Sequence, residues 1–495
     1  MTARTAIHDD DRLYIDGRWE EPSDVLEVED LADGGVFATV AAASEDHAEE
    51  ALSAARRVQR EMRETTIVER TRWLEAIADG LLDRKEELAE VIVREAGKPI
   101  SSARGEVDSA AERFRRAVEE ARNQQGEYVE GTTSGHEGWR AVVKPMPMGT
   151  VLCITPYNYP LATTALQVAP ALAAGNSIIL KPASKTPVSA AILAEIVGDV
   201  DGIPAGGFNF VPGRSSEVGD YLARDDRVDA IAMTGSSSAG KHVARESGIV
   251  NLHMELGGNA PAVVFPDADL DAVAAQCAKG SFKYAGQRCS AVSRVLAHVD
   301  VHDEVVDRLE AEVDSWQPGD LFDEETTTGP LISEEQARWV EELVEDALDR
   351  GATLVRGGER GVSGQHPDGS GDANASLGGN FFEPTLLADV PHDARIVHEE
   401  QFGPVAVVTK FSTEEVALAI ANGSTLGLDA AVFTSDYDRA MRVADALEAG
   451  AVNINGAPSH GLGDIPFGGV KDSGIGREGI GYSIEAFSTT KSIVL

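Results

Sequence analysis

The stretch VLCITPYNYPLATTALQVAPALAAGNSIILKP, residues 151–182, decides the fold of this chain. It predicts a short apolar strand (VLCIT), a turn (YNYP), a helix that ends at Gly175, and a second strand (SIILKP). Both strands are apolar along their length, which is typical of strands that are covered on both faces. The stretch therefore predicts two buried strands that are connected by a helix.

The alternation of strands and helices begins near Val142 and continues after residue 182. It is extended by a helix from Thr186, a strand in FNFVPG, a helix near Val218 and a strand in DAIAMTG that leads into SSSAGKHVARES. Strands that alternate with helices predict a parallel, doubly wound sheet. A second set of strands, in VSRVLAHVD, FEPTLLADV, VAVVTKF and AVFTS, predicts a second α/β domain, because 495 residues exceed what one core usually serves.

The remaining segments predict a strand and helices that support the fold, and a surface loop. The N-terminal part has a strand signal, LYIDGRW, and then amphipathic stretches such as HAEEALSAARRVQREM and ERTRWLEAIADGLLDRKEELAEVIVREAG, which predict helices. The stretch GVSGQHPDGSGDANASLGGN, residues 361–380, is rich in Gly, Ser and Asp and predicts a surface loop without a site.

Acidic residues dominate the charge of the chain. There are 83 Asp and Glu against 43 Lys and Arg, a formal net charge of −40, and the acids are dispersed over predicted helices such as EELVEDALDR. An acidic surface of this kind repels nucleic acid and anionic membranes, so we expect neither as a partner. We hypothesise a high-salt, halophilic cytosol in which counterions screen the repulsion.

The sequence contains no recognisable membrane or export signal. No run approaches the roughly 18 to 20 apolar residues that span a bilayer, and MTARTAIHDDDRLYIDG lacks the apolar core of a signal peptide. We therefore expect a cytoplasmic protein. Three cysteines in a long chain of this kind argue against a disulfide framework, so each thiol is free to be a candidate nucleophile.

Two glycine-rich motifs are similar to nucleotide-binding signatures. GIGREG, residues 474–479, matches G-x-G-x-x-G, but no buried strand precedes it and only 16 residues follow, so we interpret it as a chance match. GSSSAGK, residues 235–241, follows a predicted strand and opens a predicted helix, but His242 replaces the Ser or Thr of a P-loop. We expect phosphate near this helix N-terminus; a plain serine-rich cap is the alternative.

One cysteine stands out by its setting. Cys153 and Cys277 lie in apolar segments, where a thiol behaves as a small hydrophobe, whereas Cys289 follows AGQR in a polar segment. We expect the adjacent Arg288 to lower the pKa of this thiol. Taken alone, a single cysteine is more often structural than catalytic.

A second candidate is Glu255 in NLHMELGGNAPAVVF, between an apolar pair and a Gly-Gly turn. A carboxylate there has a high cost unless it has a task or a partner, so it is either a general base or a solvated loop residue. His253 is a competing base, which would suit a Cys-His hydrolase. A P-loop ATPase and a non-catalytic structural protein are two further interpretations of the same motifs.

Seven motifs together resemble the aldehyde dehydrogenase superfamily: TPYNYP, ILKPASKTP, TGSSSAG, MELGGNAP, FKYAGQRCS, EEQFGPV and PFGGVKDSGIG. They occur in order, at similar spacing, over nearly the whole chain. The resemblance implies an α/β fold with a Rossmann-like parallel-sheet cofactor domain, a second α/β catalytic domain and a small β oligomerisation extension. We place the cofactor-binding domain at residues 1–126 and 147–255, the catalytic domain at 256–474, and oligomerisation strands at 127–146 and 475–495, giving a homodimer or homotetramer.

The resemblance also implies a mechanism. Cys289 attacks the aldehyde carbon, and the Asn158 side chain and the backbone N–H of Cys289 hold the oxyanion. After hydride transfer to nicotinamide, Glu255 activates the water that hydrolyses the thioester. Relatives that acylate coenzyme A typically lack this glutamate, so we expect a free acid product and no metal.

Cofactor contacts carry over by position. The expected set is Thr155, Pro156, Tyr157, Lys181, Ser184, Lys185, Gly213, Gly235, Ser236, Leu256, Glu400 and Phe402. Relatives that prefer NAD usually have a glutamate where this chain has Ser184, next to Lys185. Because a carboxylate there repels a 2′-phosphate and a serine does not, NADP is favoured over NAD; tolerance of both is the alternative.

The resemblance is strongest to the non-phosphorylating glyceraldehyde-3-phosphate and lactaldehyde dehydrogenase group, and the expected substrate contacts are Tyr159, Arg288, Ser290 and His460. Asn123 and His460 stand where the phosphate-binding member has arginines. Losing two guanidinium groups weakens the case for a phosphorylated substrate. A short hydroxyaldehyde or a semialdehyde is therefore our main expectation, with glyceraldehyde 3-phosphate as the alternative.

Overall fold

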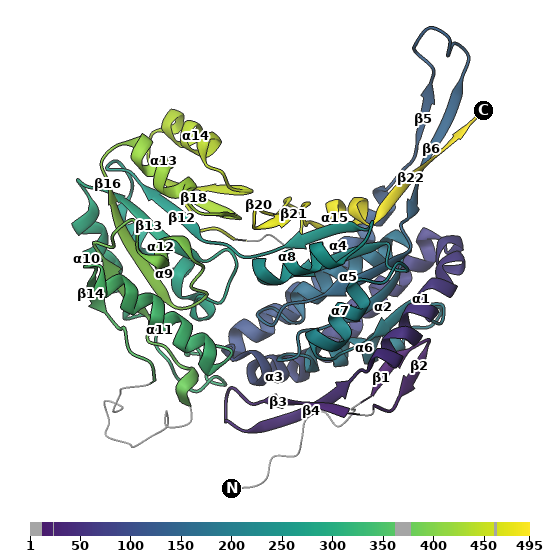
Figure 1. Cartoon of the computed structure of the whole chain (residues 1–495), viewed down its shortest axis with the longest axis horizontal. Coiled ribbons are helices and arrows are strands. Elements are labelled where there is room, and N and C mark those ends of the chain that lie inside the picture. Colours follow the sequence, from purple (N-terminus) through teal and green to yellow (C-terminus); the bar gives the residue numbers. More distant parts are fainter. Residues whose placement is uncertain (1–11, 23, 362–377, 460–462) are drawn as a thin grey trace.

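One lobe of the molecule is built on an eight-stranded sheet (Figure 1). The computed structural model describes residues 12–22, 24–361, 378–459 and 463–495. The strand order is β2-β1-β9-β8-β7-β10-β11-β21. In that order the strands are Arg18–Glu20, Leu13–Ile15, Phe208–Phe210, Ser177–Lys181, Thr150–Ile154, Ala230–Thr234, Asn251–Glu255 and Gly474–Ile475. The run from β9 to β11 is parallel, and antiparallel strands complete both edges.

Helices cover both faces of this sheet because its strands are apolar on both sides. In β7, Val151 and Cys153 pack into one core, and Leu152 between them packs into another. The first core includes α2 (Ile67–Asp83), α3 (Lys85–Ala96), α4 (Ile100–Asn123), α5 (Ala162–Ala174) and α6 (Val188–Gly198). The second includes α1 (Glu45–Glu64), α7 (Asp220–Ala223) and α8 (Ser237–Glu246).

The other lobe contains a seven-stranded sheet in the order β14-β15-β16-β13-β12-β18-β19. In that order the strands are Thr353–Arg356, Thr385–Ala388, Val405–Phe411, Val292–His298, Ala260–Val264, Asp429–Phe433 and Ala451–Ile454. All neighbours are parallel except β14 and β15. The helices of this lobe are α9 (Leu270–Phe282), α10 (His302–Val313), α11 (Glu334–Asp349), α12 (Arg395–His398), α13 (Glu414–Asn422) and α14 (Tyr437–Ala446).

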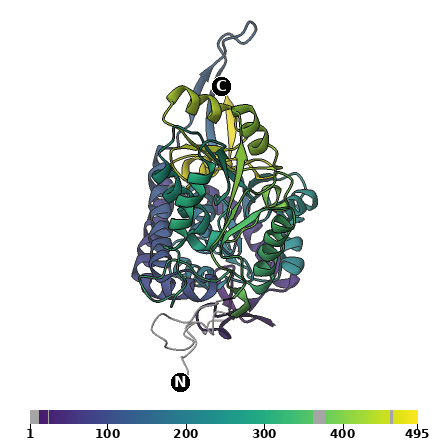
Figure 2. The same ribbon diagram turned by 90° about the vertical axis from the view of Figure 1, so that its left-hand side faces the viewer.

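A three-stranded antiparallel sheet projects from the body as an arm (Figures 1 and 2). It joins β5 (Glu127–Glu130), β6 (Arg140–Pro147) and β22 (Ser488–Val494), with β6 in the middle. The helix α15 (Ile480–Ala486) leads into β22. Two smaller sheets pair β3 (Asp24–Glu29) with β4 (Val36–Ala42), and β17 (Leu426–Gly427) with β20 (Val470–Lys471).

The predicted fold class is confirmed, with two largely parallel sheets covered by helices and small extra sheets. The stretch 151–182 folds as predicted, into β7, α5 and β8, and α5 ends at Gly175, whose φ of 87° suits a residue without a side chain. The domain boundaries stay a prediction. Most of the loop at residues 361–380 lies outside the described residues.

Some local predictions differ from the structure in detail. The long periodic stretch before Gly97 is two helices, α2 and α3, separated at Arg84. The helix near Val218 starts as a π-turn, Ser215–Gly219, and continues into α7. In GIGREG, the first residues form β21, which pairs antiparallel with β11, so the motif does not form a strand–turn–helix nucleotide site.

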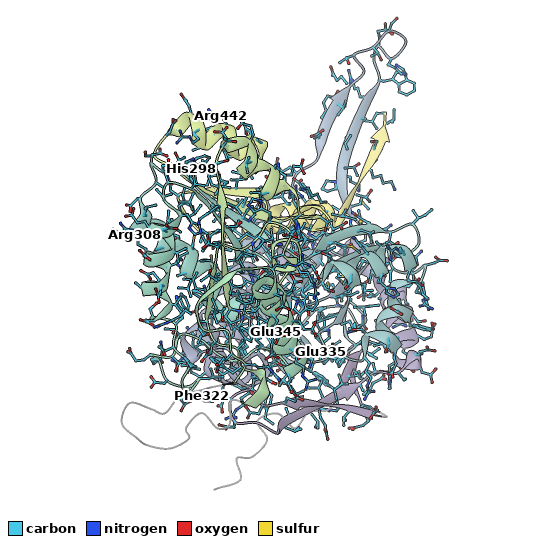
Figure 3. All side chains as sticks on the ribbon, turned by 60° about the vertical axis from the view of Figure 1, so that its left-hand side comes forward. His298, Arg308, Phe322, Glu335, Glu345 and Arg442 are labelled. Atoms are coloured by element: carbon cyan, nitrogen blue, oxygen red, sulfur yellow. The ribbon has the colours of Figure 1, made fainter. Side chains whose placement is uncertain are left out.

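Charged side chains cover the outer helices, as the composition predicts. Figure 3 places Arg308 on α10 and Arg442 on α14 at the outside of the molecule. Arg442 forms two hydrogen bonds of 2.8 Å with the carboxylate of Glu414, while Glu335 and Glu345 on α11 are exposed. Within the described ranges, no helix is long and apolar enough to cross a bilayer.

Candidate active site

A cavity of about 470 Å³ lies where the two lobes meet. Its walls come from α4, the turn after β7, the end of β11, a segment that follows α9, and the C-terminal region. The three predicted catalytic residues, Asn158, Glu255 and Cys289, line this cavity together. So do three of the predicted substrate residues, Tyr159, Arg288 and Ser290. His460 lies outside the described residues.

Cys289 is positioned by a sharply turning segment. Tyr284, Ala285 and Gly286 have φ values of 55°, 50° and 69°, so three consecutive residues occupy the left-handed region, and two of them have side chains. On the other side, a Cβ on Gly258 would lie 2.0 Å from the carbonyl oxygen of Cys289. The backbone at the thiol therefore fits only because residue 258 is a glycine.

Asn158 is fixed by the same segment. Its side-chain nitrogen donates a hydrogen bond of 3.0 Å to the carbonyl oxygen of Gln287, two residues before the thiol. The Gln287 side chain is itself held: its oxygen accepts from the N–H of Ile332 at 2.8 Å, and its nitrogen donates to the carbonyl of Pro330 at 3.2 Å. The carboxamide of Asn158 therefore has a defined orientation beside Cys289.

Glu255 ends β11 and is 2% exposed. Among the described residues, neither of its carboxyl oxygens forms a full hydrogen bond. Burial raises the pKa of Glu255 well above its usual value, the nearby Glu478 carboxyl raises it further, and Arg477 opposes the rise. A carboxyl with a raised pKa is a stronger base, once deprotonated, than an ordinary glutamate. Gly468 allows the close approach, since a Cβ there would lie 2.5 Å from the Glu255 Oε1.

The predicted effect of Arg288 on the pKa of the thiol has the correct sign, but the net shift of that pKa is upward. Burial raises the pKa of the Cys289 thiol well above its usual value, and the carboxyls of Asp429, Glu255 and Glu400 add to the rise. Arg288 acts in the lowering direction but does not prevail. Its Nη2 donates at 3.1 Å to the Ser290 hydroxyl and to the Pro458 carbonyl. Arg288, the sequence neighbour of the thiol, therefore also donates hydrogen bonds to Ser290 and Pro458. The carboxyls that raise the pKa of the thiol come from distant parts of the chain.

His253 does not take part in this arrangement. It is 4% exposed, does not line the cavity, and packs its ring edge-on against Phe487 at 5.4 Å. Burial lowers the pKa of His253 to about 4, so the ring is neutral. The alternative of a Cys-His hydrolase therefore lacks its base.

A family model described as the aldehyde dehydrogenase family matches residues 19–493. The chain belongs to this family. The resemblance stated from the motifs is thus confirmed, and the enzyme is an NAD(P)-dependent oxidoreductase that converts an aldehyde to a carboxylic acid.

Three proteins illustrate what this aldehyde dehydrogenase is similar to. It is 36% identical to the NADP-dependent glyceraldehyde-3-phosphate dehydrogenase of Streptococcus equinus, covering 97% of this chain and 98% of the relative. It is 38% identical to the mitochondrial succinate-semialdehyde dehydrogenase of Rattus norvegicus, covering 97% and 89%. The crystal structure of NADP-dependent glyceraldehyde-3-phosphate dehydrogenase from Bacillus halodurans, complexed with NADP, superposes with a TM-score of 0.93 at 34% identity, covering 99% of both chains.

The predicted phosphate-binding residues of the aldehyde dehydrogenase lie at the start of α8. Ser236 caps this ten-residue helix by accepting from the N–H of Ala239, and the N–H of Gly235 donates to the carbonyl of Glu255. The predicted Leu256 packs against α8, where a Cβ on Gly240 would lie 2.5 Å from it. A helix N-terminus with a glycine before its cap fits a pyrophosphate. The P-loop alternative fails further here, because Lys241 pairs with Asp472 and His242 with Asp220.

The predicted ribose contacts surround the end of β8. The Lys181 ammonium is 3.1 Å from the Pro182 carbonyl and 3.2 Å from the Ser215 hydroxyl, and burial lowers the pKa of Lys181 to about 8. Ser184 donates a hydrogen bond of 2.8 Å to the carbonyl of Gly213. Lys185 is exposed next to it.

The predicted nicotinamide contacts lie beside the thiol. An oxygen of Glu400 accepts from the N–H of Gly258 at 2.9 Å, and burial raises the pKa of Glu400 to about 7. Phe402, at a φ of 47°, packs edge-on against Tyr157 at 5.9 Å. The hydroxyl of Thr155 is buried without a hydrogen-bond partner among the described residues, and Pro156 lies half-buried between Thr155 and Tyr157. The Thr155 hydroxyl lacks a partner among the described residues, and the Glu400 carboxylate lies beside glycines. Both features fit a bound dinucleotide that supplies hydrogen-bond partners.

The charged lining of the cavity was missed by the sequence analysis. Asn123, named above as standing where a relative has an arginine, is an exposed residue at the end of α4 and does not line the cavity. Earlier turns of the same helix supply Glu106, Ser109 and Arg113, and Lys98 precedes the helix. The signal was present: Glu106 and Arg113 are charged residues in the helical register of the buried Ala103 and Ala110.

Proposed function

We propose that this aldehyde dehydrogenase oxidises a short hydroxyaldehyde or semialdehyde to its free acid, with NADP preferred, through a thioester on Cys289. The observation that carries the proposal is that a thiol, a buried carboxyl and an oriented carboxamide line one cavity. The named substrates of two relatives, glyceraldehyde 3-phosphate and succinate semialdehyde, are both short aldehydes with an acidic group at the far end. Glyceraldehyde 3-phosphate remains the alternative substrate.

In the first half of the reaction, the Cys289 thiol releases its proton to solvent, the resulting thiolate attacks the aldehyde carbon, and the carbonyl electron pair moves onto oxygen. Asn158 stabilises this oxyanion: its carboxamide nitrogen carries two hydrogens, one of which is used by Gln287, which leaves the other for substrate. The dinucleotide supplies an acceptor for the hydride that leaves the carbon. The product on the enzyme is a thioester of Cys289.

In the second half, Glu255 acts as the general base. Its carboxylate takes a proton from a water molecule whose oxygen attacks the thioester carbon, the carbon–sulfur bond breaks, and the acid leaves with the thiolate restored. Because Glu255 makes no full hydrogen bond among the described residues, its oxygens are available to water. Its raised pKa also makes it a stronger base than an exposed glutamate.

The preference for NADP rests on what surrounds the expected adenosine ribose. At position 184 a serine hydroxyl replaces the carboxylate that would repel a 2′-phosphate, and Lys185 is exposed beside it. Lys181, buried at the end of β8, places a second ammonium in the same region. These groups favour a dianionic phosphate.

We also propose that the arm pairs subunits into a homodimer or homotetramer in the cytoplasm. Its surface carries exposed apolar side chains, and β22 is an open edge of the arm sheet. The exposed set is Tyr128, Val129, Trp139, Val142, Ile493, Val494 and Leu495. The remaining surface is acidic, and we propose that it is adapted to a high-salt cytosol.

Replacing the base, Glu255→Gln, separates the two halves of the reaction. We expect a retained burst of reduced dinucleotide, and a steady-state turnover that is lower by roughly 10²- to 10⁴-fold, because only deacylation needs the base.

In the wild-type enzyme, turnover should rise as pH rises through the raised pKa of Glu255, since the base acts when deprotonated. Stopped-flow and steady-state absorbance measure both; Glu345→Gln is the matched control, and unchanged turnover in Glu255→Gln contradicts the role.

The cofactor preference is tested by Ser184→Glu. We expect kcat/KM for NADP to fall by roughly 10- to 100-fold, because the new carboxylate faces the 2′-phosphate, while kcat/KM for NAD is retained or rises. Ser184→Ala serves as the control for loss of the hydroxyl alone. Equal kcat/KM for the two dinucleotides in the wild-type enzyme would show that the site tolerates both.

Removing the residues after Thr490 tests the arm. This truncation deletes the pairing of Lys491–Val494 with β6, and we expect light scattering after size exclusion to report a smaller assembly. Retention of the wild-type mass would mean that β22 is an edge strand within one subunit.

The salt adaptation is tested by dilution. Because the repulsion among the acidic residues is less screened at low ionic strength, we expect the melting temperature to fall when molar salt is removed. Calorimetry at matched protein concentration measures the shift. An unchanged melting temperature, with full activity, speaks against a halophilic surface.

A further inference from the structure

Basic side chains gather in the cavity of a strongly acidic protein. Lys98, Arg113, Lys283 and Arg288 all line it, although acids outnumber bases 83 to 43 in the chain. A concentration of positive charge in a water-poor cleft attracts an anionic ligand. The cation that binds such a ligand must have donors that the protein leaves unsatisfied.

Two of the four are already engaged by protein groups. The ammonium of Lys98 forms a buried ion pair with Glu106 and lies 3.5 Å from the centre of the Tyr159 ring. Arg288 donates to Ser290 and to the carbonyl of Pro458. Lys98 and Arg288 therefore already have protein partners in the lining of the cavity.

Arg113 differs from them. The residue is only 8% exposed, yet its Nε and Nη1 atoms have no hydrogen-bond partner among the described residues. A buried guanidinium with unmade hydrogen bonds is destabilising, because its donors lose water and gain no partner, and the penalty is greater for a charged group than for a neutral one. Such a group is stable in a native site when a ligand completes it.

The surroundings of Arg113 indicate the charge of that ligand. Glu106 and Glu478 are close enough to favour its charged form, although burial outweighs them and lowers the pKa of Arg113. Three carboxyls, Glu106, Glu255 and Glu478, line the same cavity, so a dianion meets more repulsion there than a monoanion does.

Arg113 lines the same cavity as Cys289, from helix α4. It projects from α4, two helical turns beyond Glu106, which accepts from the N–H groups of Leu161 and Ala162 at the start of α5. Tyr159 is electrostatically coupled to Arg113 as well as to Arg288 and Cys289. The wall from the thiol to Arg113 is therefore continuous through Tyr159.

We propose that Arg113 binds a carboxylate at the far end of the substrate and so selects short aldehydes that end in a carboxylate. This inference rests on the proposed aldehyde oxidation and narrows its substrate class. Carboxylate oxygens accept from the guanidinium donors that the protein leaves unsatisfied. The ligand is held at its acidic end by Arg113 while its aldehyde carbon lies at Cys289.

The test compares 4-oxobutanoate with butanal, which has the same carbon chain and no charge. In Arg113→Met, we expect kcat/KM for 4-oxobutanoate to fall by roughly 10- to 100-fold, mainly through KM, while kcat/KM for butanal changes little. Arg113→Lys should recover part of the loss, because it restores the charge without the planar fork. Arg115→Met, an exposed arginine of the same helix, is the matched control.

A second readout needs neither cofactor nor turnover. In the wild-type protein, succinate should protect Cys289 from iodoacetamide, and Arg113→Met should abolish this protection, while butanamide, which has a similar chain and no charge, should protect neither protein. Absence of aldehyde oxidation with protection intact would reject the proposed function and keep the anion site. Equal losses for 4-oxobutanoate and butanal would show that Arg113 only balances Glu106 and Glu478, which overturns the inference. A wild-type preference for glyceraldehyde 3-phosphate over 4-oxobutanoate would overturn the choice of a carboxylate.

Discussion

The active site depends on the burial of a thiol and a carboxyl in one cavity. Both lose solvation, which raises the pKa of Cys289 and that of Glu255; the Glu255 carboxyl adds to the rise at Cys289, and the Glu478 carboxyl adds to the rise at Glu255. A nucleophile and a base that were both permanently ionised here would repel each other strongly. The shared burial instead suits a cycle in which the thiol is needed first and the base second.

The parallel sheets explain how these groups meet. Glu255 lies at the end of β11, and Asn158 follows β7, which is separated from β11 by β10, so both lie at the carboxyl edge of one parallel sheet. Cys289 comes from the other lobe, on a segment whose left-handed residues would be too strained in an unsupported loop. Gly258 removes the remaining obstacle, which makes a residue without a side chain as necessary to the site as the thiol.

The sequence predicted the strands and helices, because hydrophobic period is a local signal, and the resemblance of its ordered motifs to aldehyde dehydrogenases implied the grouping of Cys289, Glu255 and Asn158. It did not predict the electrostatics. Arg288 is next to the thiol in sequence, but Asp429 and Glu400, more than 100 positions away, have the larger effects on its pKa. For the same reason Arg113 was missed: which turn of α4 faces the cavity is decided by tertiary packing against α5.

The pairing of β21 with β11 has a consequence for biosynthesis. Gly474 is paired in register with Glu255 across β21 and β11, and Glu478 lines the cavity a few residues later. A chain leaves the ribosome N-terminus first, so the sheet of the first lobe can form long before these residues are made. The enclosure around the catalytic carboxyl is completed only by the last part of the chain, and a nascent or prematurely terminated polypeptide would contain a folded lobe with an open, inactive centre.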